Sequence, residues 1–113
     1  MKTLEEKMEI LAEKGKSAKL IKLASTSKKL DERIAAIAVM RTLREELVIK
    51  CLMEILKEDH DDLRKAAAIS LDRIATKLET DKLMHFAEVE ADADIKKILR
   101  EAAINSKERT PRW

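Results

Sequence analysis

The chain has 113 residues, a length that suits one domain, and 41% of them are charged. Its 24 basic and 22 acidic side chains leave a net charge of +2, which argues against a dedicated nucleic-acid binder but allows a local basic patch. With one Gly and one Pro among abundant Ala, Leu, Ile, Glu, Lys and Arg, the composition favours helices and lacks the turn residues that β-structure needs.

The first predicted helix spans Thr3 to Lys14. Thr3 is placed to cap it, and Glu6 follows at the spacing of a capping box. Gly15, the only glycine, comes where a left-handed residue usually ends a helix. No similar helix precedes this one, so we interpret it as an N-terminal cap, residues 3–14, that covers one end of a helical stack.

Three helix pairs are predicted to follow, in residues 17–45, 46–78 and 80–105. We expect Ser17 and Asp31 to cap the two helices of the first pair. The first helices share a pattern of two apolar residues, one polar residue and two apolar or small residues, which begins at Leu20, Leu52 and Leu83. The second helices align at Arg33, Arg64 and Lys96. A repeat of about 30 residues with one helix pair per repeat is typical of a helical solenoid.

The segment from Leu56 to Ala68 resembles the turn and second helix of a HEAT-like repeat, of the short kind related to bilin-lyase repeats. An acidic turn is followed by an apolar residue, an arginine and a run of alanines ending in leucine, and these places hold Leu63, Arg64, Ala66, Ala67 and Leu71. The other pairs depart from the family pattern, because Glu32 and Lys96 replace the apolar residue and the arginine, and the usual turn proline is absent.

This resemblance implies an all-α fold: a right-handed α-solenoid of about three HEAT-like helix pairs plus the capping helix, as one domain over residues 1–106. It also implies that Arg33 and Arg64 contact acidic groups of the adjacent turn and form a structural ladder along the stack. The second helices would line the concave face. The family serves many roles, so the resemblance names no function.

Candidate catalytic and metal-binding residues are few. His60 lies among Asp59, Asp61 and Asp62, but adjacent residues of one turn rarely converge on a metal ion, and aspartates at a helix start already satisfy free N–H groups. His85 aligns with polar residues and has no companion nucleophile. Cys51 aligns with lysines, which suggests partial exposure, whereas cysteine more often acts as a small buried hydrophobe. We expect no enzyme, no metal and no cofactor.

The remaining candidate is a stripe along the second helices, and we expect it to bind a partner. In the central helix it holds Lys65, Ala68 and Asp72. The residues in register with these are Ile34, Ile37 and Arg41 in the first pair, and Lys97, Arg100 and Ile104 in the third. Isoleucines without a core to fill can mark a binding surface, although a neighbouring helix could equally cover Ile34 and Ile37. We expect another protein as the partner, with an adaptor or accessory role; the alternative is nucleic-acid backbone binding through Arg41, Lys65, Lys97 and Arg100.

Residues 107–113 are predicted to form a flexible basic tail. We hypothesise that Arg112 and Trp113 insert into a partner or a second copy, because Arg and Trp are enriched at interface hot spots. The alternatives are a frayed terminus, or a tail that folds back over Leu99 and Ala103.

Compartment and origin are suggested by composition alone. A single cysteine, no membrane-spanning run and no signal peptide favour a soluble cytoplasmic protein. Abundant Lys and Glu, with no Gln and one Asn, are typical of a thermophile.

Overall fold

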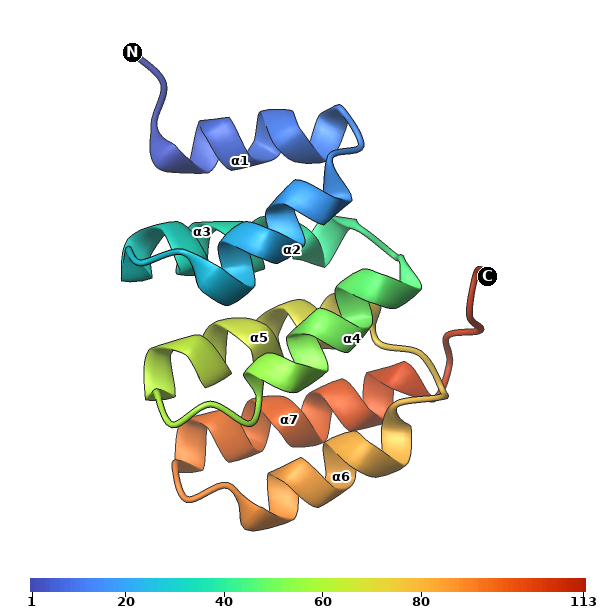
Figure 1. Ribbon diagram of the computed structural model, residues 1–113. Helices are drawn as coiled ribbons and strands as arrows, with labels where there is room; N and C mark the ends of the chain where they lie inside the picture. Colours follow the sequence, from blue (N-terminus) through green and yellow to red (C-terminus); the bar gives the residue numbers. More distant parts are fainter.

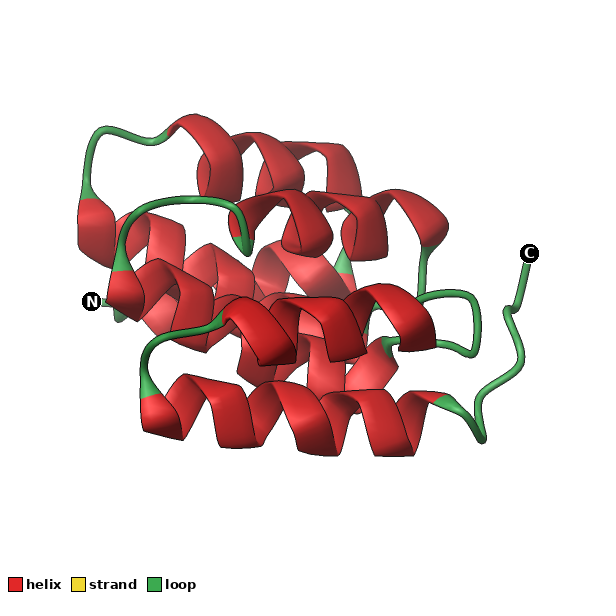
Figure 2. Cartoon of the chain, turned by 90° about the horizontal axis from the view of Figure 1, so that it is seen from below, coloured by secondary structure: helices red, strands yellow, loops and turns green.

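The structure is a computed structural model that describes all residues, 1–113. It contains seven α-helices, one short 3₁₀-helix and no strand (Figure 2). In chain order these are α1 (Leu4–Glu13), α2 (Ser17–Thr26), α3 (Leu30–Val39), η1 (Met40–Thr42), α4 (Glu46–Ile55), α5 (Asp61–Ile74), α6 (Thr80–Val89) and α7 (Ala93–Ser106). The predicted all-α class is therefore confirmed.

Helix α1 begins and ends as its sequence predicts. The Thr3 hydroxyl accepts from the Glu6 N–H at 3.1 Å, and the Glu6 carboxylate accepts from the Thr3 N–H at 3.2 Å, so the capping box is present. At the other end Gly15 has a φ of 70°, and the Lys16 N–H donates to the Leu11 carbonyl at 2.9 Å. This is a Schellman ending, which requires the left-handed backbone that glycine adopts without strain.

Two of the predicted helix caps are wrong. Ser17 is the first residue of α2 rather than its cap, and its hydroxyl donates to the Glu45 carboxylate at 2.8 Å instead. Asp31 lies inside the first turn of α3, where its charge still favours the helix dipole. At α7, by contrast, Asp92 does cap the helix, because its carboxylate accepts from the Ile95 N–H at 3.0 Å.

The helices form two layers (Figure 1). Helices α2, α4 and α6 lie in one layer and α3, α5 and α7 in the other, with α3 packed on α5 and α5 packed on α7. Helix α1 packs against α2 and α3 at one edge. The chain measures 41 × 30 × 19 Å along its principal axes.

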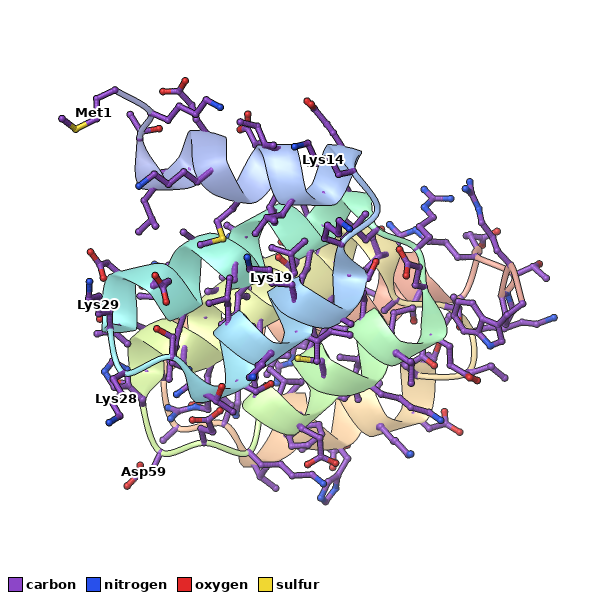
Figure 3. All side chains as sticks on the ribbon, turned by 45° about the horizontal axis from the view of Figure 1, so that its top comes forward. Met1, Lys14, Lys19, Lys28, Lys29 and Asp59 are labelled. Carbon is purple, nitrogen blue, oxygen red and sulfur yellow. The ribbon has the colours of Figure 1, made fainter.

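The parallel course of α3, α5 and α7 gives the molecule two unlike ends. All three helices begin on the left of Figure 1 and finish on its right. We call the left end, with residues 27–29, 56–60 and 90–92, the turn end; Figure 3 places Lys28, Lys29 and Asp59 there. We call the right end, with residues 40–45, 75–79 and 107–113, the link end.

The core lies between the two layers and follows the repeated pattern. Leu20, Leu52 and Leu83, which begin the pattern in the three first helices, are each fully buried. Ala36 and Ala67 are fully buried as well, and their small side chains let α3 and α5 approach closely. In α5 the buried residues that face this core include Leu63, Ala67, Ser70, Leu71 and Ile74, and Ala66 is half-buried.

Candidate functional site

The arginines aligned in the sequence lie at the turn end and connect successive helix pairs. The Arg33 guanidinium donates from Nε to the Ala24 carbonyl at 2.7 Å, and from Nη1 and Nη2 to the Glu58 carboxylate at 3.0 and 2.6 Å. Arg33 thereby binds the end of α2 and the turn after α4 together. The fork of the guanidinium suits this bidentate contact, which a lysine cannot reproduce.

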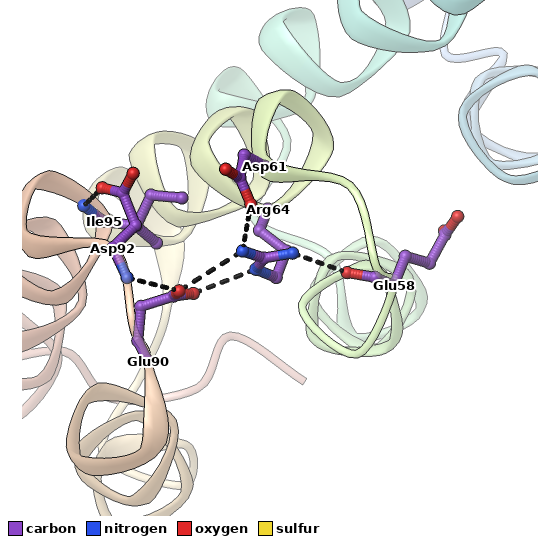
Figure 4. Close-up of polar contacts among 6 residues, drawn as sticks. All are labelled: Glu58, Asp61, Arg64, Glu90, Asp92 and Ile95. Atoms are coloured by element: carbon purple, nitrogen blue, oxygen red, sulfur yellow. Dashed lines mark hydrogen bonds and ion pairs between the residues drawn. The ribbon is translucent and has the colours of Figure 1, made fainter.

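Arg64 repeats the arrangement one pair further along the chain (Figure 4). It donates from Nη1 to the Glu58 carbonyl at 3.1 Å, and from Nε and Nη2 to the Glu90 carboxylate at 3.0 and 3.3 Å. Nη2 also contacts Asp61. The contacts with acidic groups of the adjacent turn, expected for Arg33 and Arg64, are therefore present in both pairs.

The two steps of this arginine ladder differ in burial. The Glu90 side chain is only 6% exposed, whereas that of Glu58 is 38% exposed. Burial by itself raises the pKa of the Glu90 carboxyl, but hydrogen bonds from Arg64 and from backbone N–H groups outweigh it and hold the pKa below its ordinary value. The Glu90 hydrogen bond in turn raises the pKa of Arg64. The ion pair of Arg64 with Glu90 is thus the better shielded from water of the two.

The predicted stripe along the second helices is only partly accessible. Arg41, Lys65, Lys97 and Arg100 are exposed, and Ile34 and Asp72 are half-buried. The prediction that Ile37 and Ala68 belong to this surface is wrong, because both are fully buried.

The reason is the close packing of successive second helices. The Ser70 hydroxyl of α5 donates to the Ile37 carbonyl of α3 at 2.8 Å, and this contact places α5 against the side of α3 that carries Ile37. Ala68 occupies the equivalent place in α5, one helical turn before Asp72, which accepts a hydrogen bond from Asn105 of α7. Helix α7 packs on this side of α5. Arg100 is the equivalent residue of α7 and remains exposed, since no further second helix packs on α7.

The C-terminal segment is not free throughout its length, which corrects the prediction of a flexible tail over residues 107–113. The Arg109 guanidinium donates to the carbonyls of Asp72 and Ala75 at 2.7 and 3.0 Å, and the Lys77 N–H donates to the Arg109 carbonyl at 2.9 Å. The segment therefore docks on the end of α5 at Arg109. Beyond this anchor, Arg112 and Trp113 are exposed.

The layer of first helices holds two grooves that the sequence reasoning missed. One, of about 450 Å³, lies between α2 and α4 and is lined by Ile21, Leu47 and Cys51 among others. The second, of about 500 Å³, lies between α4 and α6 beside Leu78 and Phe86. Helix α4 carries apolar residues on several faces, and not all of them can face one core. This distribution in the sequence could have indicated an apolar groove beside α4.

Cys51 is buried, so the interpretation as a small hydrophobe holds and the partial exposure suggested by its alignment does not. Its Sγ lies 3.4 Å from the Ser25 hydroxyl. Burial raises the pKa of the thiol, and the Ser25 hydrogen bond opposes this shift without cancelling it. His60 and His85 are both exposed, and no group of three or more His, Cys, Asp or Glu side chains is arranged to hold a metal ion.

Comparison of this chain with known proteins found no relative. The chain matches no protein-family model, no curated protein and no solved structure. None of its helices combines the length and the apolar character needed to cross a membrane.

Proposed function

We propose that the chain is a short right-handed α-solenoid of HEAT-like helix pairs, and that it acts as a non-catalytic module, an adaptor or accessory subunit, which binds another protein. Three contacts support a stacked arrangement: the arginine ladder at the turn end, the hydrogen bond from Ser70 to the Ile37 carbonyl, and that from Asn105 to the Asp72 carboxylate at 2.7 Å. Each joins one helix pair to the next, as stacking in a solenoid requires.

The single observation that carries a binding role is the composition of the exposed second-helix face. Ile69 is 46% exposed and Ile104 is 60% exposed, and each lies one helical turn from an exposed cation of the predicted stripe, Lys65 and Arg100 respectively. Apolar side chains beside arginine and lysine, on a rigid layer of parallel helices, suit recognition of a protein surface that carries apolar and acidic groups.

We assign a structural role to Arg33 and Arg64, and a recognition role to the cations of the exposed second-helix face. The ladder arginines bind carboxylates and carbonyls of this chain, whereas Lys65, Lys97 and Arg100 form no ion pair. We also propose a cytoplasmic location, because the only cysteine is a free thiol, as is usual in reducing compartments.

A matched pair of double variants tests the assignment. Ile69→Asp with Ile104→Asp alters the second-helix face, and Leu47→Asp with Val89→Asp alters comparably exposed residues of the other layer. Affinity purification with mass spectrometry, from the organism that encodes the chain, should recover a partner with the wild type and the second variant and lose it with the first. Loss with the second variant alone would place the interface on the first-helix layer.

A further inference from the structure

The link end carries a second group of unpaired cations, which begins three residues after Arg41 of the predicted stripe. We call it the cationic edge and define it by five side chains from three segments: Arg44, Arg73, Lys77, Arg109 and Arg112. Arg44 follows η1, Arg73 and Lys77 lie at and after the end of α5, and the last two lie beyond α7. The segments come together because η1 packs on α5 and the C-terminal segment docks there too.

Arg109 is the fixed centre of the cationic edge. Its two hydrogen bonds to the last carbonyls of α5 satisfy acceptors that a helix end leaves free, and its own carbonyl accepts from the Lys77 N–H. Arg109 is half-buried, whereas the other four side chains are exposed. The backbone contact with Lys77 holds Arg109 at the α5–α6 link, and residues 110–113 continue from this anchor.

The cations of this edge lack counterions, in contrast to Arg33 and Arg64 at the other end. None of the five has a carboxylate oxygen within 4.0 Å of a side-chain nitrogen. The nearby Asp72 carboxylate accepts from Asn105, and the Glu79 carboxylate accepts from Thr76. Burial lowers the pKa of Arg109; Arg44 and Arg73 lower it further, while Asp72 opposes them. Like charges are thus held close to one another, and a bound anion would relieve their repulsion.

An aromatic side chain adjoins the same edge. Trp113 follows Arg112 directly and is 46% exposed, although tryptophan is largely buried on average. Arginine forks match the geometry of phosphate, and an exposed indole offers a flat face on which an unpaired base can stack. An acidic peptide would satisfy the cations but would leave the indole without a comparable partner.

We propose that the cationic edge and Trp113 bind single-stranded nucleic acid, with the guanidinium groups of Arg44, Arg73 and Arg112 on phosphates and the indole stacked on a base. Arg109 positions the segment, because two of its donors serve carbonyls at the end of α5. Arg73 lies one helical turn after Ile69, so this site adjoins the exposed apolar face of the second helices. It uses other cations than the protein-binding role, and separate substitutions therefore test the two roles.

The intrinsic fluorescence of Trp113 gives a direct test. Trp113 is the only tryptophan and the chain has no tyrosine, so emission reports on this residue alone. Titration at low salt with unlabelled single-stranded RNA and DNA of about 16 nucleotides should quench this emission. Labelled oligonucleotides should show the same binding by anisotropy, with affinity falling steeply as salt rises. Absence of both signals at low salt would overturn the proposal.

Two triple variants with the same change in charge locate the site. The first removes the cationic edge with Arg44→Gln, Arg73→Gln and Arg112→Gln; the control removes the stripe with Lys65→Gln, Lys97→Gln and Arg100→Gln. None of the six side chains forms an ion pair, so both variants should keep the thermal midpoint of the wild type.

The first variant should bind at least about tenfold more weakly, and the slope of log affinity against log salt should become shallower by about 2, since each phosphate contact on a single strand contributes about 0.7. The control should bind like the wild type; a larger loss in the control would overturn the assignment. Trp113→Ala should weaken the binding affinity at least about fivefold, which is the low end of the loss expected when one stacked base loses its aromatic partner. Polyglutamate binding as tightly as the oligonucleotides would assign the edge to an acidic protein segment instead.

Discussion

The Nε atom of Arg64 lies 3.0 Å from a carboxylate oxygen of Glu90, and this contact ties the start of α5 to the turn between α6 and α7. The Arg64 side chain is 15% exposed and that of Glu90 is 6% exposed. Arg33 makes the corresponding contact with Glu58, whose side chain is far more exposed. The two steps of the ladder are chemically alike, so their difference in burial can be tested by matched substitutions.

Arg64→Ala should reduce the free energy of unfolding more than Arg33→Ala does. The first change leaves a buried carboxylate without its partner, which costs about 3 kcal/mol. The second leaves a carboxylate that water can reach, so a loss of about 1–2 kcal/mol is expected, mainly from hydrogen bonds. Urea unfolding of both variants measures the difference. Arg64→Lys should fall between wild type and Arg64→Ala, and equal losses in the two alanine variants would contradict the burial argument.

Acid should remove the contribution of Glu90 to stability. The pKa of Glu90 is held below its ordinary value in the folded chain, so its stabilisation is complete above the unfolded pKa of about 4.3 and is lost as pH falls through the folded value. Thermal midpoints of wild type and Glu90→Gln should therefore differ most near neutral pH and converge below about pH 4. Glu54→Gln removes a carboxylate that is 71% exposed and serves as the control, which should follow the wild type throughout. A constant difference between wild type and Glu90→Gln would exclude this linkage.

Ile37 and Arg100 occupy equivalent places in α3 and α7 and should respond oppositely to the same substitution. Ile37→Glu puts a charge into a fully buried position and should cost at least about 4 kcal/mol, enough to unfold much of the population. Arg100→Glu changes an exposed side chain and should alter stability by no more than about 0.5 kcal/mol. Circular dichroism melts of the two single variants decide the matter. A folded Ile37→Glu variant with an unchanged midpoint would mean that α5 does not cover this position.

The C-terminal segment should stabilise the fold through Arg109 alone. Arg109→Ala removes two hydrogen bonds to the end of α5 and should lower the free energy of unfolding by about 2 kcal/mol. Deleting residues 110–113 keeps this anchor and should leave the thermal midpoint unchanged. Deleting residues 107–113 also removes the hydrogen bond from the Lys77 N–H to the Arg109 carbonyl, so it should cost at least as much as Arg109→Ala. If the shorter deletion lowers the midpoint as far as the longer one, residues beyond Arg109 contribute to the fold.

The sequence by itself determined the local features of this protein. Apolar spacing predicted the helices, and Thr3, Glu6 and Gly15 predicted both ends of α1, because such signals act within one or two helical turns. The repeated register also brought out Arg33 and Arg64 as equivalent residues, and the contacts that they make are equivalent in the structure. Each of these inferences depends on neighbours in the chain or on a repeat of about 30 residues.

Only the tertiary structure decided which equivalent residues are buried. Ile37 and Ala68 are covered because another second helix packs on each, whereas Arg100 has no such neighbour. Cys51 aligns with lysines yet is buried. Arg109 finds its partners at the end of α5, more than thirty residues earlier in the chain. Repeat register relates positions along the chain, but burial and long-range hydrogen bonds depend on which helix lies against each face, and this is set by the packing of whole helices.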